Sequence, residues 1–181
     1  PEYASACLAL AADGALFGRP PAGLEGYEPE DRSRIRERER FARELEIAKG
    51  IRGIIFISGK PENFLAGANL KLISQIESAD EVRKTLDLFH GSFARLVALG
   101  IPAVAAIHGH CLGGGLEFAL ACTGRIAKEG KNTLIGLPEC NVGLFPGGGG
   151  TQRLPRLIGY DAFELILRGK MLPVAQAHEM G

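Results

Sequence analysis

Short apolar runs alternate with glycine-rich loops and helical patterns along most of this chain. Ile51–Ser58 is a nearly continuous β-branched run, and Ala103–Ile107 is a second run that follows Pro102. Runs of this kind are typical of strands covered on both faces, as in parallel sheets. Apolar residues at helical spacing occupy residues 80–99, 161–168 and 173–180. The alternation predicts an α/β fold with mainly parallel strands, built from units of strand, glycine loop and helix.

The remaining predicted elements are shorter. Local patterns predict strands at 125–128 and 133–135, helices at 116–122 and 151–157, a tight loop at 109–115, and a loop that turns into a helix at 63–71. Near the N-terminus, Asp13-Gly14 predicts a hairpin. Residues 30–49 alternate Glu and Arg around a thin apolar stripe, which predicts a solvated helix.

The charge balance limits the partners that this chain can have. Lys and Arg number 21, and so do Asp and Glu, so no net field favours nucleic acid or an anionic membrane. Pro1-Glu2-Tyr3 does not begin a secretory signal, no apolar run could span a bilayer, and the four cysteines form no C-x-x-C pair. His108 and His110 have no third metal ligand nearby. We therefore expect a cytoplasmic protein with reduced thiols, no metal, and no nucleic-acid or membrane partner.

Glycine is abundant, with 25 residues, and it clusters at Gly109–Gly115 and Gly143–Gly150. A glycine loop that precedes a helix can bind an anion through its N–H groups. Neither a phosphate-binding nucleotidase loop nor the G-x-G-x-x-G dinucleotide motif fits the spacing. Two hypotheses stay open. Two separate loops can supply N–H groups to one oxygen, as in an oxyanion hole, or the glycines can serve only close strand–helix packing.

Two glutamates stand in apolar surroundings beside these loops. Glu117 follows the triple glycine in LGGGLEFALAC, and Glu139 follows Pro138 in IGLPECNVGLFPG. Burial of an unpaired carboxylate is costly and raises the pKa of a carboxyl group toward neutrality, where it can act as a general acid or base. The alternative is a structural role, with each acid bonded to backbone N–H groups or to an arginine such as Arg153. Because two glutamates occur, each beside a glycine loop, a catalytic role is the better hypothesis.

Three motifs together resemble the crotonase, or enoyl-CoA hydratase/isomerase, superfamily. They are NFLAGANLK at 63–71, IPAVAAIHGHCLGGGLEFALAC at 101–122 and LPECNVGLFPGGGGTQRL at 137–154. The resemblance covers about residues 50–181. The segment between the glutamates and the GGGGTQRLPRLIG ending are most similar to the hydratase domain of multifunctional fatty-acid oxidation α-subunits.

The resemblance implies one domain over 1–181, a spiral of ββα turns truncated at the C-terminus. It implies an enoyl-CoA hydratase of fatty-acid β-oxidation, with an acyl-CoA thioester as substrate and no further cofactor. It also implies an oligomer, either trimer-based or an α-subunit with a thiolase β-subunit. The site residues that it implies are the catalytic Glu117 and Glu139, the oxyanion-hole residues Ala68 and Gly114, and the CoA-binding residues Ala66, Asn69, Leu70 and Lys71.

The chain departs from the family pattern in three places. Asn69 stands where the family usually has Asp, the segment LEGYEPED at 24–31 replaces the usual Asn-Ala-Leu in an atypical N-terminal part (1–50), and the family's C-terminal helices are absent after Gly181. Two alternatives to hydration therefore stay open. The first is a Δ3-Δ2 enoyl-CoA isomerase, which moves a proton and needs no water. The second is a non-catalytic acyl-CoA-binding or assembly module.

Overall fold

The computed structural model describes residues 50–68, 70–74 and 76–181, and gives only the backbone of Lys71 and Leu72. The hairpin predicted at Asp13-Gly14 and the helix predicted at 30–49 lie outside these residues. No helix of the described part is both long and apolar enough to cross a membrane.

The strands form two separate sheets. In the first, β1 (Ile54–Ile57), β3 (Ala103–Ile107) and β5 (Gly124–Ala127) pair in the order β1-β3-β5, and both pairings are parallel. In the second, the order is β2-β4-β6-β7, and its strands are β2 (Asn63–Leu65), β4 (His110–Leu112), β6 (Leu134–Gly136) and β7 (Met171–Pro173). Only β6 and β7 pair antiparallel among the described strands. This confirms the predicted α/β fold with mainly parallel strands.

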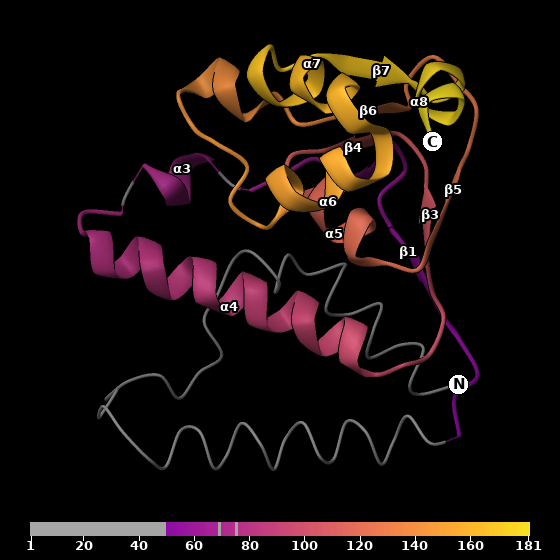
Figure 1. Cartoon of the computed structure of the whole chain (residues 1–181), viewed down its shortest axis with the longest axis horizontal. Helices are drawn as coiled ribbons and strands as arrows, with labels where there is room; N and C mark the ends of the chain where they lie inside the picture. Colours follow the sequence, from indigo (N-terminus) through magenta and orange to yellow (C-terminus); the bar gives the residue numbers. More distant parts are fainter. Residues whose placement is uncertain (1–49, 69, 75) are drawn as a thin grey trace.

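The helices lie around these sheets (Figure 1). Along the chain they are α3 (Leu70–Ile73), α4 (Ala79–Ala98), α5 (Gly114–Ala121), α6 (Gly150–Ile158), α7 (Ala162–Leu167) and α8 (Val174–Met180), with 3₁₀ turns η1 (Pro138–Val142) and η2 (Gly159–Asp161). Figure 1 shows α4 as a long rod along one side of the molecule. Helix α5 is central, because it contacts α4, α6 and strands of both sheets.

Local sequence explains how α4 and α5 begin. Ser78 caps α4, and its side chain accepts a hydrogen bond from the N–H of Glu81 at 3.2 Å. Helix α5 starts without a side-chain cap, because its N-cap residue is Gly113. This glycine takes φ 56° at the turn from β4. A left-handed φ of this kind is costly for other residues. The glycine therefore lets the chain pass directly from strand to helix.

The core lies between α5 and the two sheets. Phe93 of α4 and Phe118 of α5 are buried, and Phe118 makes an edge-to-face contact with Phe56, with ring centroids 4.9 Å apart. Such aromatic pairs add about 0.5–1.5 kcal/mol beyond their buried area. Cys111 and Cys122 are also buried, as the sequence predicts for these thiols. The same core holds α5 in place against the strands that precede it.

Three expectations were wrong in detail. The segment predicted as a loop from residue 63 begins with β2, because Asn63–Leu65 pairs with β4. Strand β1 forms, but Ile55 is 70% exposed and Ile57 47%, so among the described residues one face is exposed and the other is partly buried. A continuous apolar run favours a strand, but it does not determine which faces other elements cover. The loop predicted at 109–115 contains β4, because His110–Leu112 pairs with β2 and β6 despite its glycine neighbours.

Candidate active site

Glu117 is held by the glycine loop that precedes α6. It lies in the first turn of α5 and is only 2% exposed. Its Oε1 accepts a hydrogen bond of 2.7 Å from the N–H of Gly150, the first residue of α6. A Cβ on Gly148 would lie 2.8 Å from Glu117 Oε2. The carboxylate therefore sits against bare backbone at a helix N-terminus, where the helix dipole favours negative charge.

Glu139 has different surroundings. It lies in η1, and its Oε1 is 3.0 Å from the position that a Cβ on Gly113 would occupy. Its Oε2 is buried and has no hydrogen-bond partner among the described residues. The pKa of Glu139 is raised to about 7, chiefly by burial and to a smaller extent by the nearby charge of Glu117, while a hydrogen bond to the backbone of Glu139 opposes the rise. Near neutral pH this carboxyl group is therefore partly protonated.

The loop around Gly67 and the loop around Gly113, called the two glycine loops below, meet beside Glu139. A Cβ on Gly113 would lie 3.6 Å from the Cα of Gly67, and a Cβ on Gly67 would lie 3.4 Å from the carbonyl oxygen of Leu112. Both glycines have a positive φ, 98° for Gly67 and 56° for Gly113. Because Gly114 is the first residue of α5, its N–H has no acceptor within the helix.

The structure describes only some of the predicted CoA-binding residues. Ala66 is exposed and Leu70, the first residue of α3, is 52% exposed, so both are accessible from solvent. Ala68 is half-buried and adjoins Gly67. Asn69 lies outside the described residues, and Lys71 is seen only as backbone in α3. The structure therefore brings the two glutamates and the two glycine loops together, and it leaves the predicted CoA contacts of Asn69 and Lys71 as expectations.

The packing hypothesis is confirmed for some of the glycines, whereas the oxyanion hole stays a prediction. A Cβ on Gly115 would collide with the carbonyl oxygen of Leu65, and one on Gly109 with that of Glu62, so these two glycines serve close packing. By contrast, Gly113 and Gly148 have Glu139 and Glu117 as their near neighbours. Spacing in the sequence could not distinguish the glycines that serve packing from those beside a glutamate, because their neighbours in space are distant along the chain.

Arg153 is not a direct partner of either glutamate. Its Nη1 donates to the carbonyl oxygen of Gly148 at 2.8 Å, and among the described residues neither glutamate forms an ion pair. The sequence raised Arg153 only as a possible partner of the acids. The contact of Arg153 with the loop could not be predicted from the neighbouring residues, because it depends on how that loop folds over Glu117.

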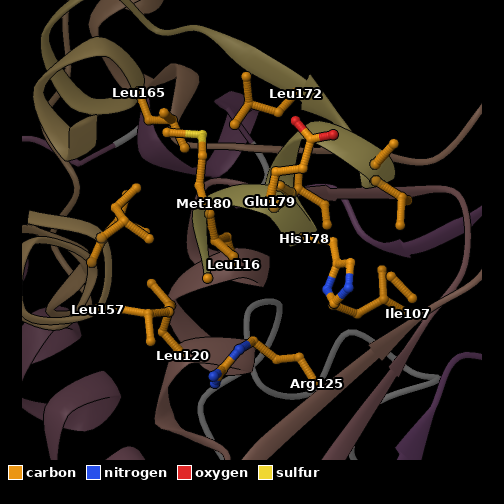
Figure 2. A pocket seen from close by; sticks show the side chains of 18 of the residues that line it. Ile107, Leu116, Leu120, Arg125, Leu157, Leu165, Leu172, His178, Glu179 and Met180 are labelled. Atoms are coloured by element: carbon orange, nitrogen blue, oxygen red, sulfur yellow. The ribbon is translucent and has the colours of Figure 1, made fainter.

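A cavity of about 630 Å³ lies on another face of α5 (Figure 2). Leu116 and Leu120, one helical turn apart, line it together with His178 and Met180 of α8. Neither Glu117 nor Glu139 lines this cavity. This cavity and the two carboxylates are therefore separate features, and the chemistry is expected where the carboxylates are.

The sequence profile of the enoyl-CoA hydratase/isomerase family matches residues 39–181. That match takes in all of the strands and helices described above. The chain belongs to the enoyl-CoA hydratase/isomerase family. This membership confirms the crotonase-like fold and the coarser expectation of an acyl-CoA-handling enzyme family.

Solved structures support the same placement. DspI of Pseudomonas aeruginosa is 33% identical, with a TM-score of 0.72 over 85% of this chain and 60% of its own. Enoyl-CoA hydratase of Bacillus anthracis is 37% identical, with a TM-score of 0.69 over 79% of this chain and 56% of its own. An enoyl-CoA hydratase of Geobacillus kaustophilus is 31% identical, with a TM-score of 0.71 over 79% of this chain and 55% of its own. The chain thus spans between 55% and 60% of the length of these family members.

Proposed function

We propose that this chain carries the catalytic residues of an enoyl-CoA hydratase, which adds water to a trans-2-enoyl-CoA to give a 3-hydroxyacyl-CoA. The observation that supports this most strongly is the contrast between two neighbouring carboxyl groups. Glu117 accepts a hydrogen bond from Gly150, whereas burial raises the pKa of Glu139 to about 7. Pairs of acids in different environments are how enzymes divide acid and base duties.

The thioester is polarised at the junction of the two glycine loops. In our proposal the substrate carbonyl oxygen accepts hydrogen bonds from the N–H groups of Ala68 and Gly114. Removal of electron density from the carbonyl makes Cβ electrophilic and stabilises the enolate that forms when water adds. Gly67 and Gly113, which directly precede Ala68 and Gly114, approach each other closely, and this supports the assignment.

Water adds between the two glutamates. Glu117 accepts a proton from water as the water oxygen bonds to Cβ, and Glu139 donates its proton to Cα. The C=C bond is consumed, one C–O and one C–H bond form, and the carboxyl groups exchange protonation states. Because both acids contact one water, the two protons titrate as a coupled pair. The partly protonated state of Glu139 near neutral pH suits the donor role.

The glutamates provide the first test. Glu117→Gln and Glu139→Gln are each expected to lower kcat by about 10²–10⁴-fold, the usual cost of a lost general acid or base, with the fold retained. Loss of the conjugated enoyl thioester absorbance measures the rate, and circular dichroism checks the fold. Wild-type turnover by either variant would contradict the assignment.

A parallel assay separates hydration from isomerisation. The same preparations are given a 3-enoyl-CoA, whose conversion to the 2-enoyl isomer requires only proton movement. We expect hydration to dominate, because two carboxyl groups lie together where isomerisation needs one. Binding of a CoA ester without turnover of either substrate would instead support an acyl-CoA-binding module.

The proposal extends to the whole protein. We propose that the CoA thioester is the substrate rather than a resident cofactor, and that the chain works in the cytoplasm within β-oxidation. We further propose that it forms the hydratase part of a multifunctional α-subunit, assembled as a trimer or with a thiolase β-subunit. Light scattering of the protein alone and with a thiolase distinguishes the two assemblies.

A further inference from the structure

We infer that Arg153 is a positioning residue: it fixes the glycine loop 148–150 and, through that loop, the carboxylate of Glu117. The inference rests on the proposed hydration, in which Glu117 is the base. It concerns a residue that does not itself touch the reacting atoms.

Arg153 makes two contacts with the loop and a third with the core. Its Nη1 donates to the Gly148 carbonyl oxygen at 2.8 Å. Its guanidinium packs so closely on Gly149 that a Cβ there would collide with Nη1. Its Cζ also lies 5.6 Å from the ring centroid of Phe93, which is 1% exposed. Guanidinium over an aromatic face is a favourable cation–π arrangement, so a rigid core residue holds the arginine in turn.

The loop that Arg153 holds is the one that surrounds Glu117. Gly148 approaches Glu117 Oε2, and Gly150 donates its N–H to Oε1 at 2.7 Å. Between them, Gly149 takes φ 99°. Three consecutive glycines have large conformational freedom when they are not held. On its C-terminal side the loop is fixed by the first bonds of α6, where Gly149 accepts from the N–H of Arg153 at 2.9 Å. The arginine side chain fixes the other side, at Gly148.

The catalytic consequence follows from geometry. A base must stay within hydrogen-bond reach of the water that it activates, and displacements of about 1 Å can cost on the order of 100-fold in rate. If Gly148 is released, the Gly150 N–H can move away from Glu117. The carboxylate then loses the donor that orients it. Loss of Arg153 should therefore lower kcat more than it changes KM.

The test compares Arg153→Met with Arg156→Met in the full chain. Arg156 lies on the same helix and donates to the Gln152 carbonyl oxygen at 2.7 Å, but that contact is exposed and away from the loop. We expect Arg153→Met to increase hydrogen exchange of the Gly150 amide and to shift its NMR resonance, while amides of β3 keep their protection. Arg156→Met should leave the Gly150 amide unchanged. Unchanged Gly150 exchange in Arg153→Met would overturn the inference.

Kinetics supply a second readout. Arg153→Met should lower kcat by about 10- to 100-fold with KM within about twofold. In a Glu117→Gln background the same change should cost no more than about twofold, because the residue acts through Glu117. An equal loss in both backgrounds would overturn the inference. Arg153→Lys can reach Gly148 but cannot stack as a planar group, so its kcat should lie between those of the wild type and Arg153→Met. It serves as the test variant if the Met variant does not fold.

The two proposals fail in different ways. If the wild type does not hydrate enoyl-CoA, the proposed function is wrong, and the Gly150 amide still decides whether Arg153 holds the loop. If the wild type is active and Arg153→Met leaves both the Gly150 amide and kcat intact, only the positioning role is wrong.

Discussion

At the scale of single residues, the two glutamates differ in how their oxygens are satisfied. Glu117 Oε1 accepts from a helix N-terminal N–H, whereas Glu139 Oε2 is buried with no partner among the described residues. Burial of a carboxyl oxygen without a donor favours the neutral form of the group. Protonation of Glu139 therefore reduces the unfavourable free energy of burying it. The stability of the fold should depend on pH for this reason.

The first residue-scale prediction concerns Glu139→Gln. Because the folded-state pKa of Glu139 is raised to about 7, the folded protein binds this proton more tightly than the unfolded chain does. Its contribution to stability is complete below the unfolded pKa and is lost as the pH rises through about 7. Relative to wild type, the glutamine variant should gain on the order of 1 kcal/mol between pH 5 and pH 8, less than the full 1.4 kcal/mol per pKa unit because Glu139 is partly exposed to solvent.

Urea unfolding of both proteins at the two pH values measures this difference. A stability difference between Glu139→Gln and wild type that does not change with pH would contradict the raised pKa.

The second residue-scale prediction concerns Gly148→Ala. Its Cβ would lie 2.8 Å from Glu117 Oε2 and 3.1 Å from the Phe93 ring, so the carboxylate must move. We expect kcat to fall by about 10-fold or more, since the base is displaced from its water. Gly130→Ala is the matched control, because a Cβ there meets nothing within 4 Å. Equal activity of the two variants would show that the position of Glu117 is not critical.

At the scale of elements, α4 has a well-capped N-terminus and a helix-destabilising glycine in its interior. Ser78 caps its N-terminus, and the acidic residues Asp80 and Glu81 lie in its first turn, where the helix dipole favours them. Gly91 lies inside the helix, and a Cβ there would meet nothing within 4 Å. The glycine therefore weakens α4 without serving a contact among the described residues.

The element-scale prediction follows directly. Gly91→Ala should stabilise the protein by about 0.5–1 kcal/mol, because alanine loses less backbone entropy in a helix. Thermal unfolding gives the change in stability, and hydratase activity should stay at the wild-type level because Gly91 lies outside the proposed site. A loss of stability would mean that position 91 makes a contact not seen in the structure.

At the scale of the whole molecule, α5 links the core to the proposed site. Its apolar residues pack between the sheets, and Glu117 projects from the same helix toward the α6 loop. Leu137, directly before η1, is fully buried and its Cδ1 would lie 3.0 Å from a Cβ on Gly150. The packing that stabilises the fold is therefore contiguous with the packing that places the carboxylates.

Leu137→Ala tests that continuity. Removal of a fully buried leucine typically costs about 2–5 kcal/mol. Leu167→Ala is the matched control, because Leu167 is 56% exposed and should change stability by no more than about 0.5 kcal/mol. Chemical denaturation of both variants gives the comparison. Similar losses would show that Leu137 is not part of the central core.

Local patterns predicted most elements well. The helix expected at 80–99 is α4 at Ala79–Ala98, and the pattern at 173–180 is α8 at Val174–Met180. Elements that depend on distant pairing were missed, namely β2 within the loop predicted at 63–71, β4 within the glycine loop, the antiparallel β7 and the turn η1. Short strands carry little periodic signal, and their existence depends on partners elsewhere in the chain.

By itself, the sequence determined the α/β class, the family, and the choice of Glu117 and Glu139 as the candidate acids, because these follow from local apolar patterns and from motifs of adjacent residues. Only the tertiary structure decided that Gly67 meets Gly113, that Gly150 holds Glu117 and that Arg153 holds Gly148. These contacts join residues far apart along the chain or depend on the conformation of a glycine loop. Their distances follow from how α5 and α6 pack, which no local pattern encodes.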